Sequence, residues 1–412
     1  MQQLTEKEWT RETLMFIEEH ADEDVRTLAL QASRYPNVQM TIAVSQIAAR
    51  QTARMKLPTW WNIRGIRYPQ HLPMEQCSSE TTARYKTTLI PRKLLSQGIT
   101  DLSGGFGVDF CMMAQGFEKA TYVERQEELC RLATYNFKLL GLSEARIVYG
   151  DAVDYLNKLD EHQGIIYIDP ARRGIGGRKT IAVSDCEPDI SVHYEKLIRK
   201  ATRVIVKLSP MLDIAQALKV IPVVSEVHVV AVAGECKELL LVMEHDAVSE
   251  KATIVCVNLP LSYPIDKKTP FRFTLEEEWS SEPDFAEKPE RYLYEPDSTL
   301  MKAGAYRTIS ARFGLRKLHP NSHLYTSESN LPDFPGRVFH IEMYGGFGKE
   351  ELRRLRTKVE KANLTVRNFP AKVDELRKRM KLAEGGDDYL FATTLNDGTK
   401  CWIWCKKTNV HS

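Results

Sequence analysis

Four acidic residues stand at the ends of four consecutive apolar runs, and this spacing carries the clearest chemical information in the sequence. They are Asp101, Glu124, Asp151 and Asp169. In an open α/β sheet the carboxyl ends of parallel strands meet in one crevice, where ligands bind. The pattern therefore predicts that the four carboxylates converge on one ligand site. The alternative is that each one only caps a helix or closes a turn.

The segment Asp101-Leu-Ser-Gly-Gly-Phe-Gly-Val-Asp109 joins the first of these runs to the helix that follows. Its glycines allow a sharp turn and a close approach of the backbone to a ligand, and a helix start offers unpaired N–H groups. Glu124 lies where a carboxylate can accept both hydroxyls of a ribose. A nucleotide-like ligand fits these features. The dinucleotide pattern G-x-G-x-x-G is not met, because Phe110 occupies the place of its third glycine.

A parallel sheet would be needed to position these residues, and the sequence predicts one from about residue 99. Short β-rich runs alternate with helix-length segments, which is typical of a doubly wound, Rossmann-like α/β domain. The runs are Ile99–Ser103, Ala120–Glu124, Arg146–Tyr149, Gly164–Ile168 and Arg203–Leu208. Two later runs, Glu226–Val232 and Glu238–Met243, flank a short turn with a glycine and should pair as an antiparallel hairpin.

The rest of the chain is expected to form other domains, since 412 residues exceed what one hydrophobic core usually organises. Thr5 and Glu8 form a capping-box pattern before helical spacing, so residues 1–75 are a helical region and 76–258 the α/β domain. Six prolines in 259–296 suggest that 259–332 is a linker with a small α+β segment that could be ferredoxin-like. Residues 333–412 are expected to be a small α/β domain. The elements expected after residue 299 are a helix (300–313), strands (318–325, 338–342, 364–369), helices (349–362, 372–382) and a hairpin turning at 396–398.

Composition excludes several classes of protein. The formal charge is +2, from 57 Lys and Arg against 55 Asp and Glu, so any nucleic-acid contact must come from a local basic surface. No run is long enough to span a membrane, and the N-terminal residues lack a basic segment followed by an apolar core, so we expect no cleaved signal. Eight cysteines lack metal-site spacing and are read as reduced. We expect a cytoplasmic protein with no metal.

At this point the sequence resembles a family. Asp101 to Gly107, Glu124, Asp151 and the segment after Ile168 resemble the successive motifs of class I S-adenosylmethionine-dependent methyltransferases, whose sheet has seven strands and ends in an antiparallel hairpin. The resemblance implies a cofactor site made of Asp101, Ser103, Gly104, Gly105, Gly107, Glu124, Asp151 and Ala152. The glycines would hold the methionine part of S-adenosyl-L-methionine, Glu124 the ribose and Asp151 the adenine amino group. Ser103 replaces the usual first glycine, which is tolerable if its backbone is not left-handed.

A closer resemblance is to a bacterial subgroup of these enzymes with a helical N-terminal region and a C-terminal THUMP-like domain. The matching segments are Glu75 to Ser79, Ala83 to Lys86, Asp169 to Arg173, Gly234 to Glu238 and Tyr292 to Asp297. The THUMP-like label implies RNA, either tRNA or rRNA, as the partner by analogy.

Asp169-Pro-Ala-Arg also resembles the D-P-P-aromatic motif of enzymes that methylate exocyclic amines of bases. Such a nitrogen is a poor nucleophile until its N–H bonds are held, which Asp169 and the carbonyl of Pro170 could do. Ala171 and Arg172 depart from the motif. Arg172 and Arg173 remain candidate substrate contacts, since a guanidinium can stack on a base or bind phosphate. The alternative is that they pair with Asp185, Glu187 or Asp189.

Pyrimidine C5 chemistry would need a cysteine nucleophile, and Cys186 is better interpreted as a buried thiol. Residues 349–381 contain 12 Lys or Arg and five Asp or Glu. A basic face for an RNA backbone could consist of Arg353, Arg356, Lys361, Arg377, Lys378 and Lys381, and the alternative is a solvated helix surface. The sequence thus predicts a methyltransferase acting on an exocyclic or ring nitrogen of an RNA base. A catalytically silent RNA-binding protein and a small-molecule methyltransferase remain alternatives.

Overall fold

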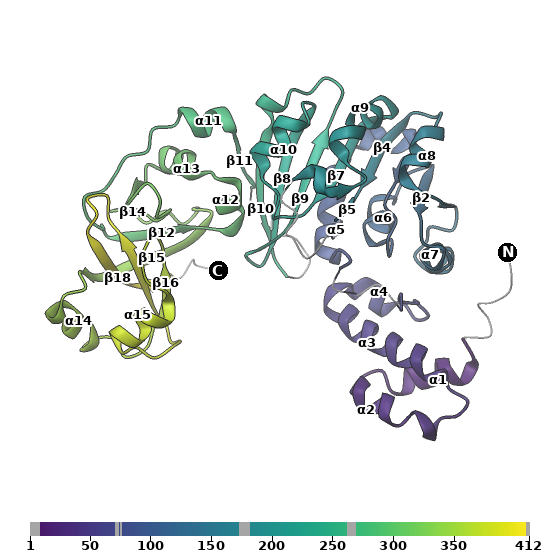
Figure 1. Ribbon diagram of the computed structural model, residues 1–412, viewed down its shortest axis with the longest axis horizontal. Coiled ribbons are helices and arrows are strands. Elements are labelled where there is room, and N and C mark those ends of the chain that lie inside the picture. Colours follow the sequence, from purple (N-terminus) through teal and green to yellow (C-terminus); the bar gives the residue numbers. More distant parts are fainter. Residues whose placement is uncertain (1–8, 71–73, 75, 173–181, 262–268, 409–412) are drawn as a thin grey trace. The chain divides into compact units, whose positions relative to one another are not determined.

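The computed structural model describes residues 9–70, 74, 76–172, 182–261 and 269–408. The chain divides into two compact units (Figure 1). The first comprises Met1–Val227, Glu238–Ser249 and Leu259–Asp266, and the second comprises His228–Lys237, Glu250–Asn258 and Lys267–Ser412. In the described part of the chain, no helix has the length and apolar character needed to cross a membrane.

The candidate site residues lie on a large mixed sheet. Its strands are β1 (Ile99–Asp101), β2 (Ala120–Glu124), β3 (Arg146–Tyr149), β4 (Gln163–Ile168), β7 (Ala201–Leu208), β8 (Val224–Val232), β9 (Glu235–Met243), β10 (Thr253–Leu259) and β11 (Phe271–Thr274), in the order β11-β10-β8-β9-β7-β4-β1-β2-β3. β1 pairs in parallel with β2 and β4, β2 with β3, and β4 with β7, whereas β7 and β9 are antiparallel. The predicted doubly wound sheet with a terminal hairpin is confirmed. The expected count of seven strands is wrong for the described residues, because β10 and β11 extend the sheet to nine.

One helix precedes these strands and others connect them. The helices are α5 (Glu80–Thr87), α6 (Val108–Met113), α7 (Glu127–Leu139), α8 (Ala152–Lys158), α9 (Ile190–Lys200) and α10 (Ile214–Val220), with 3₁₀ turns at Arg92–Gln97 and Val183–Asp185. Acidic residues cap the starts of several of these helices. Asp151, Asp189 and Asp213 each accept a hydrogen bond from a backbone N–H of the first turn, at α8, α9 and α10. Such caps satisfy N–H groups that have no partner inside the helix. A two-stranded ribbon of β5 (Ala171–Arg172) and β6 (Cys186–Glu187) follows β4.

The N-terminal region is helical, as predicted. Its helices, purple to blue in Figure 1, are α1 (Arg11–Glu19), α2 (Val25–Leu30), α3 (Met40–Lys56) and α4 (Pro58–Asn62), with a 3₁₀ turn at Ala32–Arg34. Thr10 caps α1, while Thr5 and Glu8 of the expected capping box lie outside the described residues. The Asn136 side chain of α7 accepts from the N–H of Arg67 at 3.0 Å and donates to its carbonyl at 2.7 Å. These bonds hold the segment after α4 to α7.

The second unit contains a seven-stranded sheet in the described residues. Its order is β13 (Arg316–Lys317), β14 (Tyr325–Ser327), β12 (Tyr292–Pro296), β15 (Gly336–Gly345), β18 (Lys400–Lys407), β17 (Asp388–Thr394) and β16 (Asn363–Val366). The helices are α11 (Leu275–Ser280), α12 (Ser298–Ala303), α13 (Tyr306–Phe313), α14 (Lys349–Arg356) and α15 (Val373–Met380). A 3₁₀ turn at Ser249–Lys251 begins at the last residue of one segment of the first unit. β15 pairs with both β12 and β18, so the sheet is continuous across residue 333.

Several expected elements of this unit differ from the structure. The helix expected over 349–362 ends at Arg356. The helix expected over 300–313 is two helices, because Gly304 adopts a left-handed conformation with φ +76° and ends α12. The strand expected over 318–325 is wrong. Leu318 donates from its N–H to the carbonyl of Leu324 at 3.1 Å, which closes a turn, and His323 has φ +52°.

Gly107, at the start of α6, offers a test of how the first turn of the domain is packed. Its φ is +84°, and a Cβ there would lie 2.8 Å from Cε1 of Phe137. Gly107→Ala should therefore lower the free energy of unfolding by about 2 to 4 kcal/mol, from the backbone strain and the overpacking together.

The matched control is Gly141→Ala, because Gly141 has φ +78° and a Cβ added there would meet nothing within 4 Å. It should cost only about 1 kcal/mol. The free energies of unfolding are measured with denaturant. An equal decrease in the two variants would show that the clash with Phe137 adds nothing to the cost of Gly107→Ala.

Candidate functional site

The sheet brings three predicted carboxylates and one lysine to a single edge. Asp101 ends β1, Glu124 ends β2, Asp169 follows β4, and Lys207 is the penultimate residue of β7. Because β1 lies between β2 and β4, and β4 lies between β1 and β7, their carboxyl ends are neighbours. Convergence of these groups follows from the strand order.

Asp101 shapes the glycine-rich turn. Its Oδ1 accepts from the N–H of Ser103 at 2.8 Å, the N–H of Gly104 at 3.0 Å and the hydroxyl of Ser103 at 2.8 Å. The Ser103 hydroxyl also accepts from the N–H of Asp169 at 2.8 Å. The φ of Ser103 is not positive, so a side chain is tolerated there. The serine that replaces the usual glycine thus connects Asp101 to Asp169.

The glycines of the turn have different tasks. A Cβ on Gly104 would lie 2.8 Å from Cβ of Glu124 and from the Tyr122 ring, so this glycine is required by packing. Gly107 is required by Phe137 in the same way. Gly105 has φ +61°, and the nearest atom to its Cβ position is 3.8 Å away. Gly105 therefore leaves open space in which a ligand could approach the backbone.

Glu124 lies beside this turn and is only 6% exposed. Its Oε2 accepts from the N–H of Gly105 at 2.8 Å, and its Oε1 accepts from the N–H of Gln126 at 2.7 Å. A carboxylate offers about four acceptor positions, so roughly two remain for a diol. The side chain is held in place before any ligand binds.

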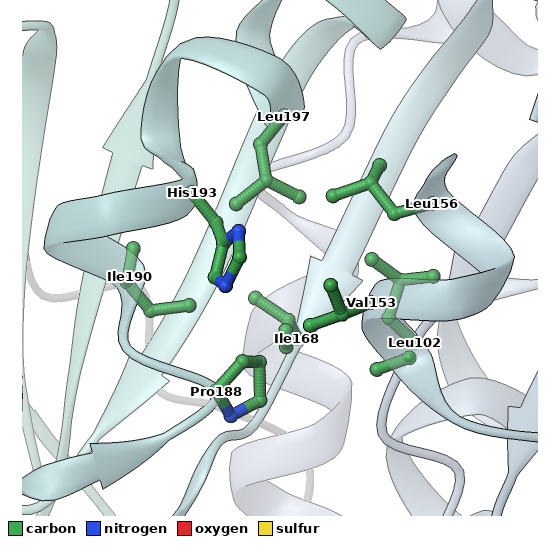
Figure 2. A pocket seen from close by; sticks show the side chains of 9 residues that line it. Leu102, Val153, Leu156, Ile168, Pro188, Ile190, His193 and Leu197 are labelled. Atoms are coloured by element: carbon green, nitrogen blue, oxygen red, sulfur yellow. The ribbon is translucent and has the colours of Figure 1, made fainter.

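Asp151 and Ala152 lie at the start of α8. Asp151 is exposed and accepts from the N–H groups of Val153 at 2.8 Å and Asp154 at 3.1 Å, so it acts as a helix cap. Ala152 lines an apolar pocket between α8, α9 and the end of β4 (Figure 2). The pocket is lined by Leu102, Ala152, Val153, Leu156, Ile168, Pro188, Ile190, His193 and Leu197. Figure 2 shows His193 pointing from α9 into the space between Val153, Ile168 and Pro188. The lining is largely apolar.

Asp169 is held at two points. Its N–H is bound by Ser103, and its Oδ2 lies 2.5 Å from Nζ of Lys207, while the side chain remains 40% exposed. Pro170 is buried directly after it. Arg172 lies in β5, opposite Cys186, which is 2% exposed as expected for a buried thiol. Arg173 lies outside the described residues, so its expected role has no structural test.

A buried ionic network behind Asp169 was not predicted. Lys86 of α5 has no exposed surface, and its Nζ lies 2.7 Å from Oε1 of Glu238 and 3.0 Å from Oδ1 of Asp109. Oδ2 of Asp109 accepts from the hydroxyls of Ser78 and Tyr167, both at 2.7 Å, and lies 3.9 Å from Nζ of Lys207. Lys86 and Glu238 belong to segments that match the bacterial subgroup, but nothing in their spacing indicates that they meet.

The charges of the network explain its protonation. Burial would raise the pKa of Asp109, but Lys86 and Lys207 outweigh it and lower that pKa to about 2. Burial would lower the pKa of Lys207, but Asp169 and Asp109 outweigh it and raise that pKa above its usual range. No cation is among the groups that shift the pKa of Asp101, and burial raises that pKa to about 7. In the described residues, no cluster of His, Cys, Asp and Glu side chains could hold a metal ion.

Comparisons with known proteins agree with this arrangement. A crystal structure of a protein from Porphyromonas gingivalis W83, provisionally identified as a methyltransferase, is 36% identical, with a TM-score of 0.85, and the match covers 96% of this chain and 98% of that one. An uncharacterised S-adenosylmethionine-dependent methyltransferase of Mycobacterium tuberculosis H37Rv is 23% identical over 316 residues, which are 75% of this chain and 79% of the relative. A ferredoxin-like domain model matches residues 292–335, and a THUMP domain-like model matches residues 336–407.

The raised pKa of Asp101 gives a pH-dependent prediction. Between about pH 4 and 7 this carboxyl is protonated in the folded protein and ionised in the unfolded chain, so its contribution to stability is complete at low pH and declines as pH rises through 7. Asp101→Asn cannot ionise. Its melting temperature relative to wild type should therefore rise by several degrees from pH 4.5 to pH 8, because up to about 4 kcal/mol is at stake.

The exposed Asp160→Asn is the matched control and should show the same offset from wild type at both pH values. Calorimetric melting of the three proteins provides the measurement. If the melting temperature of Asp101→Asn differed from that of wild type by the same amount at both pH values, the predicted titration of Asp101 would be contradicted.

Proposed function

The chain belongs to the family of S-adenosylmethionine-dependent methyltransferases, and from this premise we propose that it methylates a nitrogen of a base in RNA. In S-adenosylmethionine the methyl group is bound to a positively charged sulfonium sulfur. This sulfur is a good leaving group because it departs as a neutral thioether when the methyl group is transferred. The protein must therefore mainly hold the acceptor nitrogen in line with that methyl group and exclude water. We propose a cytoplasmic location as well, supported by eight cysteines that form no disulfide.

The residues of the site support placement of the cofactor at the glycine-rich turn. Gly105 leaves open space beside the backbone, and Glu124 keeps about two acceptor positions for ribose hydroxyls. The apolar side chains beside Ala152, at the start of α8, would face the adenine ring. Asp101 and Ser103 would act by holding the turn in shape, and Asp151 by starting α8.

The observation that carries the proposal is the placement of Asp169. Its carboxylate stands at the end of β4, is partly exposed, and has one oxygen held by Lys207. Among the described residues, no hydrogen bond to Oδ1 is found, so this oxygen could accept an N–H from the target nitrogen. As the nitrogen bonds to the methyl group it loses a proton, which Asp169 can accept and pass to solvent. The carbonyl of Pro170 would hold a second N–H. Arg172 and Arg173 remain proposed contacts to the RNA.

RNA binding is supported by the THUMP domain-like match and by exposed Lys and Arg side chains on and between α14 and α15. Two of the six expected basic residues have structural tasks instead. Arg356 donates to the carbonyls of Met380 at 3.0 Å and Arg379 at 2.8 Å, and Arg377 donates to those of Ala362 and Ala383. We therefore restrict the basic face to Arg353, Lys361, Lys378 and Lys381, which are exposed.

Asp169→Asn tests the chemistry. The substitution keeps size and one acceptor but removes the charge, so the single-turnover rate of methyl transfer should fall by a factor on the order of 10² to 10⁴. The assay is transfer of tritium-labelled methyl from S-adenosylmethionine to total RNA from cells that lack the protein.

Asp213→Asn is the control, because Asp213 is an acid that caps α10, and it should keep the wild-type rate. An unchanged rate for Asp169→Asn would remove Asp169 from the reaction. No transfer to RNA by the wild-type protein would reject RNA as the substrate.

Arg353→Gln combined with Lys378→Gln tests the basic face. If both residues contact phosphates, affinity for bulk tRNA should fall, and the slope of log affinity against log salt should become shallower by up to about two. Lys93→Gln combined with Lys119→Gln removes the same charge from exposed positions of the first unit and serves as the control. Equal affinities and slopes in the two double variants, measured by filter binding, would reject this face as the RNA contact.

A further inference from the structure

Lys207 has more buried contacts than a surface lysine that pairs with an acid. Its side chain is 15% exposed, and its Nζ lies 2.5 Å from Oδ2 of Asp169, 3.2 Å from Oγ of Ser78 and 3.9 Å from Oδ2 of Asp109. An ammonium has three N–H donors. Asp169 and Ser78 take two of them, and Asp109 lies at 3.9 Å, beyond hydrogen-bonding distance, so the ammonium is engaged mainly within the protein rather than with a phosphate or a base.

The network behind Lys207 keeps the ammonium charged. Asp109 is held by Lys86, Ser78 and Tyr167, and Lys86 is held in turn by Glu238. The two lysines thus face three carboxyl groups at this edge of the sheet. Because the surrounding carboxylates raise the pKa of Lys207, the side chain cannot serve as a base at any working pH. It can act only through the group it holds.

A carboxylate fixed in this way presents its Oδ1 as an acceptor of hydrogen bonds. It favours a target that offers N–H groups and releases a proton only as the new bond forms. An exocyclic amine meets both conditions. A ring nitrogen with only a lone pair, such as N7 of guanine, would be repelled. A ring N–H must lose its proton completely before it can attack.

We propose that Lys207 is a positioning residue that holds the Asp169 carboxylate as a hydrogen-bond acceptor for the target, and that this restricts the target to an exocyclic amine of adenine, guanine or cytosine. The inference rests on the proposed function. In the transfer the amine nitrogen bonds to the methyl carbon, the carbon–sulfur bond breaks with its electrons passing to sulfur, and the amine proton passes to Oδ1 of Asp169 and then to solvent. No other reactant is needed.

The test is single-turnover transfer of a deuterated methyl group from S-adenosylmethionine to total RNA from cells that lack the protein, followed by mass spectrometry of the nucleosides. Wild type should label an N6-methyladenosine, N2-methylguanosine or N4-methylcytidine. Lys207→Met should lower the rate by on the order of 10²-fold, with the cofactor dissociation constant from calorimetry changed less than about threefold. Lys207→Arg keeps the cation and should recover at least about tenfold of that loss.

Arg203→Met is the matched control, because Arg203 lies on the same strand and pairs with Glu244 at 2.7 Å, away from Asp169. It should keep the wild-type rate. If Lys207→Met does not fold, Lys207→Gln, which keeps a donor without the charge, replaces it with the same expected loss.

Three results would overturn the inference. A labelled ring nitrogen in the wild-type product would reject the restriction to amines. If the neutral Lys207 variants transferred methyl at the wild-type rate while Asp169→Asn was slow, positioning by Lys207 would be rejected. The proposed function would then still stand. Wild-type rates in both the Lys207 and Asp169 variants, or no transfer to RNA at all, would instead mean that the proposed function itself fails and the inference with it.

Discussion

The buried ammonium of Lys86 is the interaction on which the rest of the site depends. A charge without exposed surface is tolerated only beside opposite charges, and here Asp109 of α6 and Glu238 of β9 supply them. Removing one member of such a network typically costs about 3 to 5 kcal/mol, because the others are left unpaired. The helix before the sheet, the first helix after the glycine-rich turn and the terminal hairpin must therefore meet at one point. Lys207 and Asp169 take their positions from this arrangement.

The glycine-rich turn is built on a similar principle. Asp101 and Glu124 use several of their acceptor positions to bind backbone N–H groups of the turn and of the segment that follows β2. The turn is thus shaped by the protein itself before a cofactor arrives. Binding then costs less ordering, which favours affinity without additional contacts. In our proposal Glu124 both contacts the cofactor and preorganises its site, while Asp101 shapes the turn.

The parallel sheet and the acidic residues at its strand ends could be predicted from sequence, because alternation of strands and helices and residues at strand ends are local patterns. The network could not, since Lys86 and Glu238 are 152 residues apart and neither stands in a periodic pattern. β10 was missed although Thr253–Leu259 is rich in β-branched residues, because the nearby prolines suggested a boundary. The sequence also could not show that Arg353 and Arg356 have different roles. Only the fold shows that the guanidinium of Arg356 donates hydrogen bonds to carbonyl groups of the neighbouring helix.

The central claim is that this methyltransferase acts on an RNA base through Asp169. The most direct measurement is mass spectrometry of nucleosides from the RNA of cells with the protein, without it, and with the Asp169→Asn variant expressed at the same level. The account predicts that one methylated nucleoside is lost with the protein, returns with the wild-type chain and does not return with the variant. Identical nucleosides in all three RNA samples would contradict it.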